Sequence, residues 1–170
     1  MSNLLVTLPL QLFCHLVGTT NCIYENFTSV PGQNSVSVSQ PKALPIGYTA
    51  FPDVSTAYKW VEVAAPTWNE ARKRCILEGA NLASPDSFKK IRYAYSVTNG
   101  KVQPYLGIHK TYDGHEWTSD RTGLPLTSLP WAPSAHPQDV EKKVTYLNVE
   151  GLREDAGDTT GSFICEIILV

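Results

Sequence analysis

Two segments that each contain a cysteine constrain the fold of this chain more than any other feature. Residues 67–75 read Thr-Trp-Asn-Glu-Ala-Arg-Lys-Arg-Cys, and residues 162–166, near the end of the chain, read Ser-Phe-Ile-Cys-Glu. In the first segment Trp68, Ala71 and Cys75 recur at the spacing of one helix face, which predicts an amphipathic helix with a buried stripe. Taken alone, the pattern fits any such helix, and Cys165 fits an ordinary buried strand residue.

Together the two segments resemble the frame of the C-type lectin-like domain, in which a helix with Trp-x-Glu-Ala-x-x-x-Cys is joined by a disulfide to a last strand with Phe-Ile-Cys-Glu. Further resemblances lie between them, at 79–83 (Gly-Ala-Asn-Leu-Ala), 105–109 (Tyr-Leu-Gly-Ile-His), 116–120 (Glu-Trp-Thr-Ser-Asp) and Trp131. The resemblance covers residues 57–170. It implies an α+β fold, with two helices flanking a small, mostly antiparallel sheet and a long binding loop, and a disulfide between Cys75 and Cys165.

The order of the expected elements also favours an α+β domain. Strands are predicted at 58–63, 105–109, 144–149 and 161–168, and helices at 67–78 and from Pro85-Asp86 to Asn99-Gly100. Pro66 is expected in the first turn of the first helix, and Gly79 is expected to end that helix. The Pro- and Gly-rich stretch that runs to Lys143 is predicted to be a binding loop on a rigid scaffold.

The N-terminal part of the chain is typical of an exported protein. Residues 1–20 are expected to be a secretory signal peptide, because the apolar run 4–17 has the length of its hydrophobic region. The run is too short for a membrane span, which takes about 20 apolar residues. The sequon Asn26-Phe27-Thr28 predicts N-glycosylation of Asn26, although chance matches to so short a motif are common. We therefore expect a secreted, extracellular protein without a membrane span.

Residues 21–56 are interpreted as a tail or linker, because prolines are spread among serine, valine and threonine. The alternation at 36–39 is compatible with an extra edge strand instead. In an oxidising compartment Cys22 would be left over once Cys14 is removed and Cys75 pairs with Cys165. It would then join two chains as a disulfide-linked dimer, be removed by cleavage after it, or be capped by a small thiol.

The resemblance also indicates where a calcium ion and a sugar would bind. Sugar-binding members hold Ca²⁺ with a Glu-Pro-Asn or Gln-Pro-Asp triplet and a later Trp-Asn-Asp, because the ion needs about 6–8 oxygen ligands. The corresponding residues are His136-Pro137-Gln138 with Asp139, and Leu152-Arg153-Glu154 with Asp155. If calcium binds, its ligands would be Gln138, Asp139 and Glu154, with Asp155 as the alternative carboxylate.

Three departures weaken this calcium site. An imidazole nitrogen at His136 is a poor ligand for calcium, and the Arg153 guanidinium repels a dication. The inner disulfide of the family is missing, since Val144 and Gly157 occupy about those two places. The Leu-Arg variant resembles single-domain secreted lectins of arthropod haemolymph, and Pro137-Gln138-Asp139 resembles the galactose-type triplet.

The resemblance therefore implies a recognition protein for glycans or glycoproteins, with microbial surface glycans in innate immunity as the expected ligands and a degenerate calcium site. The alternative is a metal-independent protein-binding module that uses the same loop. Its contact residues would be of the types that dominate interface hot spots: Tyr112, His115, Trp117, Arg121, Trp131 and Arg153. The two tryptophans are expected to be buried beneath the loop instead.

Other classes of function have no support in the sequence. The chain has 14 basic and 16 acidic residues and a formal net charge of −2, which gives no bulk charge for nucleic-acid binding. Common catalytic motifs do not occur, so we expect no enzyme. The spacing of His109, His115 and His136 matches no metal template. Asp113, Glu116 and Asp120 are expected to be solvated or to support an auxiliary calcium ion.

Overall fold

The structure is a computed structural model that describes residues 43–100, 103–111 and 113–169. The expected signal peptide, Cys22, the sequon at Asn26 and Tyr112 lie outside these residues. Within the described ranges, no helix combines the length and the apolar content that crossing a bilayer requires.

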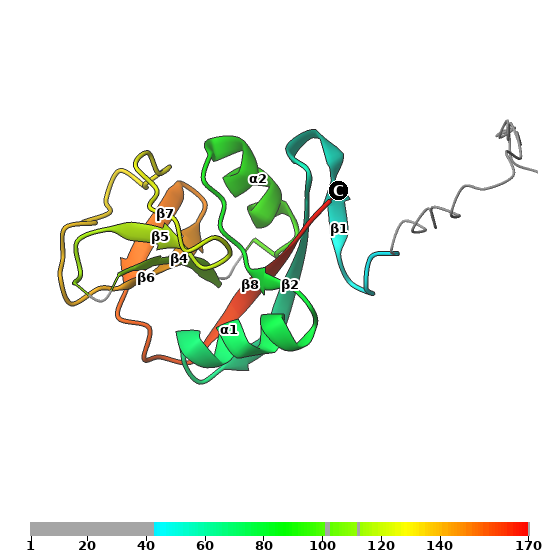
Figure 1. Ribbon diagram of the computed structural model, residues 1–170, viewed down its shortest axis with the longest axis horizontal. Coiled ribbons are helices and arrows are strands. Elements are labelled where there is room, and N and C mark those ends of the chain that lie inside the picture. The colour runs from blue at the N-terminus through cyan, green and yellow to red at the C-terminus, as the bar shows by residue number, and fades with distance from the viewer. Residues whose placement is uncertain (1–42, 101–102, 112, 170) are drawn as a thin grey trace, which may run out of the picture. The chain divides into compact units, whose positions relative to one another are not determined.

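One mixed sheet organises the described domain (Figure 1). Its strands follow the order β1 (Thr49–Phe51), β2 (Thr56–Ala65), β8 (Gly161–Ile168), β4 (Tyr105–Lys110), β6 (Val144–Asn148) and β7 (Gly151–Asp155). Two short strands lie off this path: β3 (Asn81–Leu82) pairs with β8, and β5 (Trp117–Ser119) pairs with β4. All pairs are antiparallel except β4 with β8. The predicted α+β fold with a mostly antiparallel sheet is confirmed.

Each of the two helices begins with a side-chain cap. Helix α1 (Trp68–Leu77) is capped by the hydroxyl of Thr67, and helix α2 (Phe88–Ser96) by the hydroxyl of Ser87. The predictions that Pro66 lies in the first turn and that Pro85-Asp86 open the second helix are therefore wrong. Serine and threonine hydroxyls satisfy free N–H groups at a helix start, so the caps determine both boundaries.

Four strands of the sheet were not predicted from the sequence: the short β3 and β5, and also β1 and β7. Strand β1, followed by the short 3-10 helix Pro52–Val54, lies in the expected linker and pairs with β2. Strand β7 coincides with the expected ligand motif and pairs with β6. Both contain residues that are not typical of strands, and β1 is largely exposed, so neither shows an alternating apolar pattern.

The apolar side chains form two clusters. One includes Tyr58, Leu106, Ile108, Leu147 and Leu152 together with residues of α2. The other is built from residues of α1, of the sheet and of the segment between them: Ala65, Ala71, Cys75, Ala80, Leu82, Tyr105, Val144, Phe163 and Cys165. Since residues alternate between the faces of a strand, neighbouring residues of β4 and β6 enter different clusters. The sheet thus has a buried cluster on each face.

The predicted disulfide between Cys75 and Cys165 is confirmed. Both residues are fully buried in the second cluster, with their Cα atoms 5.4 Å apart. The bond fastens α1 to the last strand β8 across a sequence separation of 90 residues.

The two positions that correspond to the missing inner disulfide lie in contact. A Cβ atom built on Gly157 would be only 2.9 Å from Cγ2 of Val144. A valine and a glycine therefore pack together where the resemblance places a second bond between cysteines. This contact supports the residue correspondence that was drawn from the sequence around the loop.

We expect the Cys75→Ala/Cys165→Ala double variant to lose about 2–4 kcal/mol of unfolding free energy, because the disulfide constrains a long loop in the unfolded chain. Urea unfolding under non-reducing conditions measures the difference. Ile76→Ala, on the exposed side of the same helix, is the matched control and should change stability by at most about 0.5 kcal/mol. A double variant as stable as the parent would contradict this role of the disulfide.

Candidate functional site in the long loop

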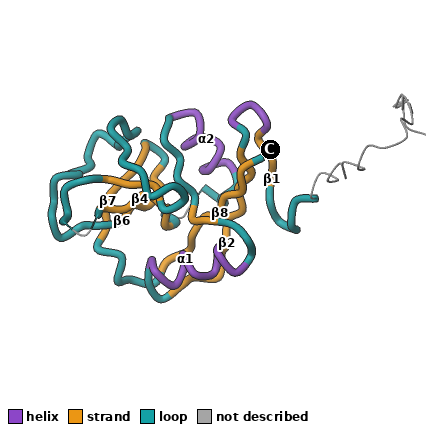
Figure 2. Tube along the Cα trace, viewed as in Figure 1, coloured by secondary structure: helices purple, strands orange, loops and turns teal. Residues whose placement is uncertain are grey.

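The loop between β5 and β6, residues 120–143, contains no helix or strand and is the long loop predicted from the sequence (Figure 2). Trp117 and Trp131 fix its course, since their rings pack edge to face with centroids 4.9 Å apart. The indole nitrogen of Trp117 donates to the carbonyl of Pro137 at 3.2 Å, and Trp131 forms a bridge to Leu152 of β7. The expectation that these tryptophans pack beneath the loop holds for the buried Trp117, and Trp131 is half-buried.

Glu154 of β7 is the buried carboxylate of this region, with only 4% of its side chain exposed. Its Oε1 atom accepts a hydrogen bond from the backbone N–H of His136 at 2.9 Å. The ammonium group of Lys142 lies 3.6 Å from the same oxygen. Oε2 is buried and has no hydrogen-bond partner among the described residues. Glu154 therefore holds the loop through both a backbone hydrogen bond and an ion pair.

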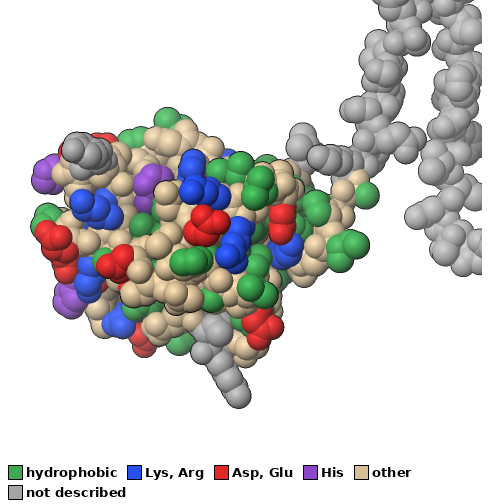
Figure 3. Space-filling view, turned by 90° about the horizontal axis from the view of Figure 1, so that it is seen from below, with side chains coloured by type: hydrophobic (Ala, Val, Ile, Leu, Met, Phe, Trp, Pro, Cys, Tyr) green, Lys and Arg blue, Asp and Glu red, His purple; other side chains and the backbone are tan. Residues whose placement is uncertain are grey.

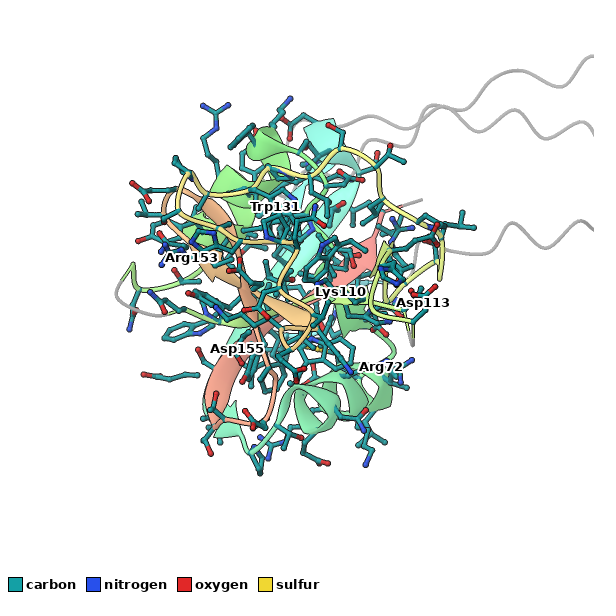
Figure 4. All side chains as sticks on the ribbon, turned by 90° about the vertical axis from the view of Figure 1, so that its left-hand side faces the viewer. Arg72, Lys110, Asp113, Trp131, Arg153 and Asp155 are labelled. Carbon is teal, nitrogen blue, oxygen red and sulfur yellow. A yellow bond between two sulfur atoms is a disulfide. The ribbon has the colours of Figure 1, made fainter. Side chains whose placement is uncertain are left out.

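A second ammonium group, that of Lys110, enters the same region from the end of β4. Its Nζ atom donates to the carbonyl of Asp139 at 2.6 Å and lies 5.0 Å from the ring centroid of Trp117. The residue is only 6% exposed, and this burial lowers the pKa of Lys110, while the negative charges of Asp139 and Glu154 act in the opposite direction. In Figure 4 Lys110 lies between Trp131 above and Arg72 below.

Neither lysine was predicted from the sequence to be part of the site. For Lys110 the sequence contained a signal of an inward position. Leu106 and Ile108 are buried in the same cluster, and Lys110 follows them at strand spacing. A lysine at an inward position of a strand needs a polar partner, which the loop carbonyl supplies. Lys142 carries no comparable signal, because a lysine before a strand is usually a solvated residue.

Two residues of the expected His136-Pro137-Gln138 triplet face outward. His136 and Gln138 are exposed, and the described contact of His136 is made by its backbone. Asp139 is half-buried, and its Oδ1 accepts the backbone N–H of Glu141 at 3.1 Å. Its Oδ2 lies 4.0 Å from Nζ of Lys142. Asp139 and Glu154 thus meet around Lys142.

This arrangement does not fit calcium. Among the described residues no cluster of three or more acidic, histidine or cysteine side chains is suited to hold a metal. Two ammonium groups lie beside the carboxylates that were predicted to bind the ion, and like charges repel. Calcium requires about 6–8 oxygen ligands, and here one carboxylate is already used by a backbone N–H and a lysine.

Arg153 and Asp155 lie on the face of β7 opposite to Glu154, because they alternate with it along the strand. The guanidinium of Arg153 donates to the carbonyl of Ser134 at 3.2 Å and to its hydroxyl. Oδ1 of Asp155 accepts the N–H of Gly157 at 2.7 Å and a hydrogen bond from the Tyr105 hydroxyl at 3.2 Å. Arg153 therefore also contacts the long loop, at Ser134, but from the face of β7 opposite to Glu154, and Asp155 lies on that opposite face too.

The other candidate carboxylates do not gather into a site. Asp113 is exposed in a turn, where hydrogen bonds from Thr111 and from the backbone of His115 lower its pKa. Asp120 is buried and pairs with Arg72. Arg121 pairs with the buried Glu166 at 3.1 Å and is thus engaged at the sheet.

The chain is similar to known proteins in both sequence and structure. The family model of the Lectin C-type domain matches residues 64–167, which is more than half of the chain. No curated protein matches the sequence. Among solved structures, the carbohydrate-recognition domain of the mouse scavenger receptor C-type lectin has a TM-score of 0.65 at 16% identity, covering 75% of this chain and 98% of that one.

Two further structures show the range of proteins with this fold. A calcium-independent type II antifreeze protein matches with a TM-score of 0.64 at 18% identity, covering 75% of this chain and 96% of that one. The cow carbohydrate-recognition domain of CD23, in the presence of an oligosaccharide, matches with a TM-score of 0.63 at 17% identity. The match covers 75% of this chain and 98% of that one. At these identities the structural matches establish the fold, and the sequence match establishes the family. The chain belongs to the C-type lectin domain family.

Proposed function

We propose that this protein is a secreted recognition module that binds its ligand through the long-loop face without calcium. The observation that carries the proposal is the position of Lys110 and Lys142 beside Asp139 and Glu154. The two ammonium groups supply positive charge at the carboxylates where the resemblance places the calcium ion. Lys110 of β4 and Lys142 of the loop thereby attach the loop to β4 and β7.

The exposed side chains of the loop favour a protein surface as the ligand. Leu124 is 64% exposed and Val140 is 56% exposed, and both are apolar residues of the loop. Protein interfaces bury apolar side chains at their centre and keep a polar rim, so exposed apolar side chains on a loop suit a protein partner. Figure 3, which views the domain from the side where α1 lies in Figure 1, shows acidic and basic side chains interspersed on that face.

A glycan is the second candidate ligand, and two of the similar structures are carbohydrate-recognition domains. In this case the ligand would be a microbial surface glycan in innate immunity. Recognition would then depend on direct hydrogen bonds instead of coordination of the sugar by a metal. A dimer joined through Cys22 would raise the avidity for a repetitive surface of either kind.

Titration of calcium into the protein should give no saturable heat, and calcium or EDTA should leave its thermal midpoint unchanged. A ligand that stabilises the native state raises the midpoint according to its affinity, so both measurements report the same event. Saturable binding that disappears in the Glu154→Gln variant would show that calcium does occupy this site and would refute the proposal.

Lys110→Met should lower the unfolding free energy by about 1–3 kcal/mol, because it removes the hydrogen bond from the ammonium group to the Asp139 carbonyl and the cation contact with the Trp117 ring. Lys143→Met, at an exposed neighbouring lysine, is the matched control and should cost at most about 0.5 kcal/mol. Urea unfolding compares the two variants. Equal effects would mean that Lys110 does not hold the loop.

Ligand binding should be insensitive to EDTA and should weaken in the Leu124→Ser/Val140→Ser double variant. A glycan array and a panel of cell-surface proteins, each probed with and without EDTA, provide the readout. Val63→Ser, at an exposed apolar residue of β2 outside the loop, is the control and should bind as the parent does. Binding that EDTA abolishes would favour a calcium lectin instead.

A further inference from the structure

A small hollow lies on the face of the sheet that β7 turns away from Glu154. Its volume is about 250 Å³, and its lining residues come from β4, β6, β7, β8 and the adjoining chain: Gln103, Tyr105, Tyr146, Asp155, Thr159, Thr160 and Gly161. Pockets for drug-sized ligands start at roughly 300 Å³, so this hollow suits a single small chemical group. It is separate from the long-loop face, because Glu154 and Asp155 point to opposite sides of β7.

Two tyrosines lie side by side in this hollow. Tyr105 of β4 is directly opposite Tyr146 of β6 in the antiparallel register, so both side chains project from the same face of the sheet. The Tyr105 hydroxyl lies 3.0 Å from the Thr159 carbonyl and 2.8 Å from the Thr159 hydroxyl. These contacts hold the Tyr105 ring in place, while Tyr146 is half-buried.

Asp155 gives the hollow its charge. Its Oδ1 atom accepts hydrogen bonds from the N–H of Gly157 and the hydroxyl of Tyr105, which fix the orientation of the carboxylate. In the described part of the chain Asp155 forms no ion pair, and the described lining residues include no lysine, arginine or histidine. Arg153 shares this face of β7 and lies opposite Tyr146, but its guanidinium is bonded to Ser134. The hollow therefore presents a carboxylate outside any ion pair beside aromatic rings.

We propose that this hollow binds a small alkylammonium group. Tyrosine rings attract cations through their negative faces, and a carboxylate at the same place adds direct charge attraction. An anionic ligand would meet repulsion from Asp155 and no compensating cation among the described lining residues. The site needs neither the long loop nor a metal, so it does not depend on the function proposed above.

Titration of the full chain with choline, followed by NMR of the backbone amides, tests the proposal. Saturable shifts should occur at Tyr105, Tyr146 and residues 159–161. The uncharged isostere 3,3-dimethylbutan-1-ol should bind at least roughly tenfold more weakly, since it lacks the charge that the carboxylate and the rings attract. Equal binding of the isostere, or no saturable shift with choline, would overturn the proposal.

Two variants test whether Asp155 supplies the charge. Asp155→Asn keeps the oxygen that accepts the two internal hydrogen bonds and removes the charge, so it should fold normally and weaken choline binding about tenfold. Asp158→Asn removes a charge from a nearby exposed position that does not line the hollow and should bind as the parent does. Equal losses of choline binding in both variants would indicate only a general effect of charge and would overturn the proposal.

A saccharide and a membrane are the competing occupants. Methyl glucoside should give no saturable shift at the hollow, and its binding there in place of choline would overturn the proposal in favour of a sugar site. Phosphatidylcholine vesicles that bind the chain while free choline does not would likewise overturn it, because a membrane contact would then be the source of the interaction.

Discussion

The buried ammonium group of Lys110 is the interaction on which the account of the long loop depends. It bonds to the Asp139 carbonyl, lies over the Trp117 ring, and is attracted by the carboxylate of Glu154. A buried charge is tolerated only when it is paired and hydrogen-bonded, so the loop must keep this course for the lysine to remain in place. In this chain, therefore, the cation that organises the loop is part of the protein.

Strand β7 divides the molecule into two chemically different surfaces. Glu154 faces the loop and its lysines, whereas Asp155, the next residue, faces the two tyrosines of the hollow. The separation follows from the alternation of side chains along a strand, and a shift of one residue in register would exchange the two carboxylates. The pairing of β6 with β7, together with the contact of Val144 and Gly157, fixes that register.

Local patterns predicted the frame of the fold but not the interior of the site. The helix with Trp68, Ala71 and Cys75 and the last strand were predictable from short-range periodicity. The disulfide was predicted because the two cysteine motifs resemble those of the C-type lectin-like domain. Whether Glu154 or Asp155 faces the loop was left open, since this depends on strand pairing between distant residues. The role of Lys110 was missed because its partner, the Asp139 carbonyl, is 29 residues away and in a loop without periodicity.

Diffraction data from crystals of the protein grown with excess calcium and then soaked in a lanthanide would test the central claim most directly. The account predicts no anomalous peak beside Glu154, with the Lys110 ammonium in hydrogen-bond contact with the Asp139 carbonyl. A strong peak coordinated by Glu154 and Asp139, with Lys110 and Lys142 displaced, would contradict it.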